Sequence, residues 1–112
     1  MDATQLYSST LEQLNQVIIK MTSLEWDAKI QASPPDQRQQ ALVELLHVQH
    51  ARLVLGNAVL QDIAQKLKSN EKDLVDGQQA VQEALDKLAT VASVLTAIST
   101  LITVVARIVP LV

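Results

Sequence analysis

Residues 88–112 read LATVASVLTAISTLITVVARIVPLV, and this stretch decides the fold because it is almost entirely apolar and holds one charged residue, Arg107. Such a segment must bury its surface against other helices or in lipid. It also continues a seven-residue repeat that begins at Leu74. The first row of the repeat is Leu74, Val81, Leu88, Leu95, Ile102 and Val109, and the second is Gly77, Ala84, Val91, Ile98, Val105 and Val112. The repeat predicts one long helix over 71–109 in a left-handed bundle or coiled coil, ended by Pro110.

The composition favours an all-α fold in a single domain, 1–112. The chain is 48% hydrophobic and 19% charged, which is typical of a folded protein with a core. Its only aromatic residues are Tyr7 and Trp26, so the core must be built from aliphatic side chains. Two glycines and three prolines are too few for the many tight turns of an all-β fold.

Several functional classes are not expected. The net charge is −3 and the nine lysines and arginines form no patch, so no nucleic-acid binding is predicted. There is no cysteine, no glycine-rich phosphate loop and no nucleophile elbow, so the chain is not expected to be an enzyme or to carry a cofactor. The first residues have no basic and apolar signal pattern, and we expect a cytoplasmic protein unless 88–112 acts as a membrane address.

Two further helices precede the long one. The first is predicted over 4–32, with an apolar stripe that includes Tyr7, Leu14 and Met21 at helical spacing. Trp26 lies off this stripe and is expected to be partly buried. The segment Ser33-Pro34-Pro35-Asp36 ends this helix and begins the next, since serine caps a helix and proline suits its first turn.

The second helix is predicted over 34–68 and is apolar on two sides. Its heptad seam is Leu46, Leu53, Leu60 and Leu67, alternating with Gln49, Gly56 and Ile63. Its other flank is Ala41, Leu45, Val48, Leu55 and Val59. A helix with two apolar sides has to be covered twice. Gly56 lowers helix propensity by about 1 kcal/mol against alanine, and a close helix crossing is the expected reason for it.

These elements predict an elongated antiparallel three-helix bundle, a rod roughly 50 Å long at about 1.5 Å per residue. A turn near Asn70 places Leu88 opposite Leu53, Leu95 opposite Leu46 and Ile102 near Gln39. The charged span 61–87 then projects as a two-helix tip. The remaining apolar surface predicts assembly into a dimer or a larger bundle.

The first functional hypothesis is a non-enzymatic interaction protein that self-associates through its C-terminal helix and presents the charged tip to a partner, such as another helical protein. The residues expected at this oligomer or core interface are Leu88, Val91, Leu95, Ile98, Leu101, Ile102 and Val105.

A membrane-active protein is the second hypothesis, because 88–106 is an uncharged stretch of nineteen residues, just enough to span a bilayer. It would act as a tail anchor or as one helix in the wall of a toxin-like helical pore. The membrane or pore face would be the hydroxyl row that ends at the arginine: Ser93, Thr96, Thr100, Thr103 and Arg107. The plain structural interpretation of this row is the weakly polar outer face of an amphipathic helix.

A metal-binding dimer is the third and weakest hypothesis. Glu44, His47 and His50 follow one another at spacings of three on one helix, and Glu-x-x-His is half of the motif that di-iron bundles use. The alternative is an ordinary solvated face with contacts between neighbouring turns.

Overall fold

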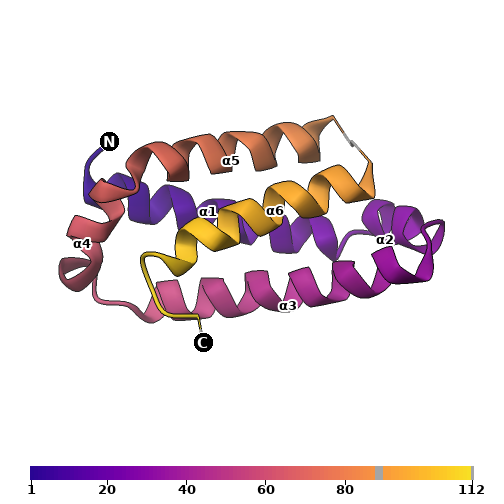
Figure 1. Ribbon diagram of the computed structural model, residues 1–112, viewed down its shortest axis with the longest axis horizontal. Coiled ribbons are helices and arrows are strands. Elements are labelled where there is room, and N and C mark those ends of the chain that lie inside the picture. Colours follow the sequence, from indigo (N-terminus) through magenta and orange to yellow (C-terminus); the bar gives the residue numbers. More distant parts are fainter. Residues whose placement is uncertain (88–89, 112) are drawn as a thin grey trace.

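A computed structural model describes residues 1–87 and 90–111, and the regular secondary structure in this part of the chain is entirely helical, with no strand (Figure 1). The predicted all-α fold is therefore confirmed. The helices are α1 (Ala3–Met21), α2 (Leu24–Gln31), α3 (Pro35–Asn57), α4 (Leu60–Ser69), α5 (Glu71–Asp86) and α6 (Val91–Ala106).

The four long helices form a closed bundle with principal extents of 44 × 26 × 19 Å. Helix α1 packs against α3 and α5, and α6 packs against the same two helices from the other side. Helices α1 and α5 run in one direction, while α3 and α6 run in the other (Figure 1). The short helix α2 connects α1 to α3, and α4 connects α3 to α5 and packs on α1.

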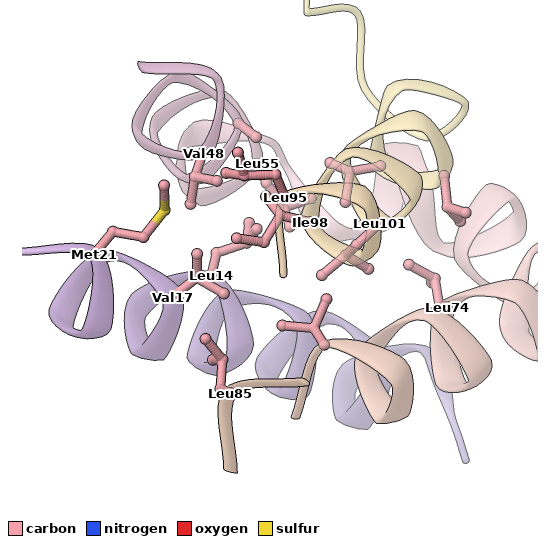
Figure 2. Close-up of a cluster of buried hydrophobic side chains, with 14 of the residues drawn as sticks. Leu14, Val17, Met21, Val48, Leu55, Leu74, Leu85, Leu95, Ile98 and Leu101 are labelled. Carbon is pink, nitrogen blue, oxygen red and sulfur yellow. The ribbon is translucent and has the colours of Figure 1, made fainter. Parts of the chain in front are cut away.

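The core lies between the four long helices and is aliphatic. Figure 2 shows side chains from each of them meeting there, including Leu14 of α1, Leu55 of α3, Leu74 of α5 and Leu95 of α6. Full burial of each such side chain is worth about 1.5–3 kcal/mol relative to exposure. Trp26 is also buried, which is more than the partial burial expected for it.

The prediction of one continuous helix over 71–109 is wrong. Helix α5 ends at Asp86 and α6 begins at Val91, and the two lie antiparallel, side by side (Figure 1). Thr90 caps α6, since its hydroxyl accepts a hydrogen bond from the backbone N–H of Ser93 at 3.2 Å. A heptad repeat indicates which face of a helix is apolar. That face is buried equally well whether the helix continues along a partner or its two halves fold onto each other.

The predicted helices over 34–68 and 4–32 are also each divided in two. Helix α3 ends at Asn57, and Ala58 and Val59 adopt extended backbone before α4. Gly56-Asn57 has low helix propensity, which weakens the helix at this point. A Cβ at Gly56 would lie 3.9 Å from Leu11 Cδ2, an ordinary contact distance, so Gly56 is not at the close crossing expected for it. Helix α1 ends at Met21, and Ser23 caps α2.

These breaks change the pairing of the helices. The three-helix rod assumed that the C-terminal helix runs antiparallel to α3, whereas α6 runs parallel to it. Ile102 therefore shares a groove with His47 instead of lying near Gln39. The span 61–87 does not project as a two-helix tip, because α4 packs on α1 and α5 packs on both α1 and α6.

Candidate interaction surfaces

The predicted oligomer face of the C-terminal helix lies inside the bundle. Five of its residues are buried with at most 8% exposure: Val91, Leu95, Ile98, Leu101 and Val105. Ile102 is half-buried, and Leu88 lies outside the described residues. These side chains pack against the other helices of the same chain. A second copy could reach them only if the bundle opened.

The hydroxyl row of α6 lies on its outer, exposed face, as expected for an amphipathic helix. Three of the hydroxyls donate to carbonyl oxygens one turn back in the same helix: Thr96 to Ala92, Thr100 to Thr96, and Thr103 to Ser99. At the end of the row, Arg107 binds Asp73 of α5 at 2.8 Å. These four polar side chains therefore find their partners within α6 and α5.

No helix within residues 1–87 and 90–111 is long and apolar enough to cross a membrane. Helix α6 comes nearest in composition, but its 16 residues extend only about 24 Å at 1.5 Å per residue. The hydrocarbon core of a bilayer is about 30 Å thick.

The largest exposed apolar residues of α3 form a stripe, and two of them, Leu46 and Leu53, belong to the seam that the sequence predicted to be covered. Leu42, Leu46 and Leu53 are 65%, 64% and 59% exposed. Leu46 and Leu53 each precede a buried residue, Val48 and Leu55, by two positions, which is about 200° around a helix. The predicted heptad seam of α3 thus faces outward. We call Leu42, Leu46, Gln49 and Leu53 the α3 stripe.

The flanks of the α3 stripe carry basic groups. On the α1 side lie Arg38 and Arg52, and on the α6 side lies His50. Arg52 Nε donates a hydrogen bond to the side-chain oxygen of Asn15 on α1, and Arg38 lines a pocket with Leu42 and with Asp27 of α2. Of the two acidic residues of α3, Asp36 is exposed and Glu44 is buried beside α6.

A groove of about 390 Å³ lies between α3 and α6 and contains the three residues of the metal hypothesis. Its walls are Glu44, His47, His50, Ser99, Ile102, Thr103, Ala106 and Leu111. His47 Nδ1 lies 3.5 Å from Glu44 Oε1, and His50 Nε2 lies 3.1 Å from the carbonyl oxygen of Leu111. Among the described residues, no group of three or more histidine or acidic side chains is placed to hold a metal ion.

The sequence singled out three residues of each surface but missed Leu42 of the stripe, and Ala106 and Leu111 of the groove, and it placed the stripe in the core. The spacing of the α3 leucines was recognised as a seam, yet the second apolar flank of α3 is the one that faces the core. The signal that decides which flank of α3 faces the core is the size of the side chains on that flank. Ala41, Val48 and Ala51 are small enough to leave room for neighbouring helices, and all three are buried.

The fold and its surfaces define the class of protein: a small four-helix bundle with two connecting helices, an exposed leucine stripe and one groove that contains a buried carboxylate. Comparison with family models, with curated proteins and with solved structures gives no match to this chain.

Proposed function

We propose that this chain is a non-enzymatic helical interaction module that pairs with a second copy of itself through the α3 stripe. The observation that carries the proposal is the exposure of three leucines at heptad spacing on one helix face. A heptad seam is the surface by which one helix packs along another. The self-association expected from the sequence is kept, but it is moved from α6 to α3.

The second copy fits this stripe in an antiparallel arrangement. A two-fold axis between residues 47 and 48 pairs Leu42 with Leu53 of the second copy and Leu46 with Gln49 of the second copy. The same pairs recur on the other side of the axis, as a two-fold interface requires. Gln49 is the polar residue near the centre, and a polar side chain within an apolar seam favours one register over shifted ones.

The flanking residues are compatible with this arrangement. In an antiparallel pair the same register places Arg52 beside Leu45 of the second copy, and His50 beside its Val43. The position opposite Arg38 is residue 59, which follows the end of α3, so Arg38 has no neighbour on the second α3 helix. No two basic groups face each other, and the stem of Arg52 lies along an apolar side chain.

The pairing is expected to be weak. Each half-exposed leucine contributes about 1–2 kcal/mol on burial, and association opposes this by at least about 4 kcal/mol. The expected dissociation constant is therefore at or above about 1 µM. The fraction of the chain that is dimeric therefore rises and falls with the concentration of the chain.

The test is sedimentation equilibrium of the full chain between about 5 and 500 µM. The wild type should shift from monomer to dimer, and Leu46→Asp should remain monomeric because a charge in the seam loses its hydration. Leu24→Asp is the matched control, since Leu24 is 89% exposed on α2 and lies off the stripe; it should dimerise like the wild type. A wild type that stays monomeric at 500 µM contradicts the proposal, as does equal dimerisation of Leu46→Asp.

Binding to lipid is the competing outcome. If the wild type sediments with phosphatidylcholine and phosphatidylglycerol vesicles, and dimerises in their absence no more than Leu46→Asp does, the stripe serves a membrane surface and the dimer proposal is wrong.

A further inference from the structure

The buried carboxylate of Glu44 is the least satisfied polar group of the bundle. Its side chain is 10% exposed, and Oε2 is buried without a hydrogen-bond partner in the described part of the chain. A buried charge is costly unless it is paired and hydrogen-bonded. The nearest basic group is the His47 ring, 3.5 Å from the other carboxylate oxygen and itself more than half exposed. Oε2 therefore lacks a partner, and the group beside Oε1 is a largely exposed histidine instead of a lysine or arginine.

Glu44 lines the groove between α3 and α6, and the walls of that groove are amphipathic. Ile102, Ala106 and Leu111 supply apolar surface, while Ser99 and Thr103 place hydroxyl groups along one rim. The volume of about 390 Å³ falls within the range of small-molecule sites. The segment after α6 also lines the groove, where the carbonyl oxygen of Leu111 lies 3.1 Å from His50 Nε2.

We propose that this groove binds a small organic cation: an amine with a short hydrocarbon chain. The ammonium group would supply the charge and the hydrogen-bond donors that Glu44 lacks, and the chain would pack on the apolar wall. A metal ion fits less well, because the described residues place no three ligating side chains together. The groove adjoins the α3 stripe at His50 but contains none of the four residues of the stripe. This inference therefore goes beyond the proposed dimer and can fail without it.

The test uses n-hexylamine, which is protonated at pH 7, with hexan-1-ol as the uncharged probe of the same chain length. Amide chemical shifts of the full ¹⁵N-labelled chain are followed by NMR, in a Leu46→Asp background so that self-association does not contribute. Hexylamine should give saturable shifts centred on Glu44, Ser99 and Thr103. Hexan-1-ol should bind at least tenfold more weakly.

Two variants locate the site. Glu44→Gln removes the charge and should weaken hexylamine at least tenfold, whereas Glu12→Gln, on the exposed face of α1, should leave binding unchanged. Thr103→Phe fills the groove from its exposed rim without touching the core and should abolish binding, which keeps the test decisive if Glu44→Gln folds poorly. Equal affinity for the amine and the alcohol, unchanged binding by Glu44→Gln or Thr103→Phe, or the absence of saturable shifts would each overturn the proposal.

Discussion

Gly77 of α5 lies against Leu101 of α6: a Cβ at position 77 would be 3.3 Å from Leu101 Cδ1 and 3.7 Å from Leu101 Cα. Leu101 is fully buried, so it has little room to move away. Glycine at this position permits α5 and α6 to approach closely enough for the two apolar rows of the heptad to interlock. The close crossing that the sequence suggested at Gly56 is therefore located at Gly77.

Replacing Gly77 with valine should destabilise the bundle by about 1–3 kcal/mol, the usual effect of overpacking a core. The matched substitution Gly56→Val meets only an ordinary contact with Leu11 and should change stability by less than about 0.5 kcal/mol. Urea unfolding followed by circular dichroism measures both. Equal destabilisation by the two variants would show that α5 and α6 are not in close contact at Gly77.

A buried leucine of α6 and an exposed leucine of the α3 stripe should respond differently to truncation. Leu95→Ala removes a fully buried side chain and should lower the free energy of unfolding by about 2–5 kcal/mol. Leu46→Ala removes an exposed one and should lower it by less than about 0.5 kcal/mol when measured at a concentration where the chain is monomeric. A large loss from Leu46→Ala under those conditions would place the α3 seam in the core after all.

A polar contact fixes α1 against α5. Thr10 is fully buried, donates to the carbonyl oxygen of Leu6 at 2.7 Å and accepts from Gln78 Nε2 at 2.9 Å. Thr10→Val keeps the shape but leaves the Gln78 amide without this partner, and should destabilise by about 1 kcal/mol. A double-mutant cycle with Gln78→Leu should give a coupling energy of about 0.5–1.5 kcal/mol. Strict additivity would show that the hydrogen bond contributes nothing.

The stability of the bundle should fall in acid partly because of Glu71. Hydrogen bonds from the Lys68 ammonium and from the N-terminal amine lower the pKa of Glu71 below its ordinary value of 4.5. A lowered carboxyl pKa stabilises the folded state above the unfolded pKa, and this contribution is lost as the pH falls through the folded pKa. Thermal unfolding between pH 6 and pH 2 should show a smaller acid-induced decrease for Glu71→Gln than for the wild type. An identical decrease in both proteins would contradict this role.

The fold class could be predicted from the sequence because aliphatic composition and helical periodicity are local properties. The break at Ser33–Asp36 could also be predicted, because proline acts within one turn. The capping role expected for Ser33 is wrong: Pro34 is the N-cap of α3, and the Ser33 hydroxyl donates to the carbonyl oxygen of Lys29 at 2.8 Å. The break between α5 and α6 could not be predicted from the sequence in the same way. Leu74, Leu95 and Ile98 keep the same heptad phase whether the chain continues or folds back, and the buried surface is alike in the two cases.

The orientation of α3 could not be predicted for a related reason. Two apolar flanks lie on this helix, and apolar spacing does not distinguish the one containing Val48 from the one containing Leu46; the local difference is the small size of Ala41 and Ala51 beside Val48. The choice depends on which flank the other three long helices cover, and that follows from their directions. The parallel pairing of α3 with α6 comes from the chain reversal between α5 and α6, which the heptad pattern concealed, and it also brings Glu44 beside Ser99 and Ile102 in one groove.

Residue-specific cross-linking tests the antiparallel pairing of two α3 helices most directly, because the chain contains no cysteine of its own. In the proposed register, residue 36 of one copy lies beside residue 57 of the other, whereas two copies of residue 36 are about 30 Å apart at 1.5 Å per residue. Equal amounts of Asp36→Cys and Asn57→Cys chains are mixed and treated with a short bismaleimide. The account predicts a cross-linked dimer in the mixture, absent from either variant alone and lost when both chains also carry Leu46→Asp. Cross-linking that is equally strong within each single variant, or that survives Leu46→Asp, would contradict it.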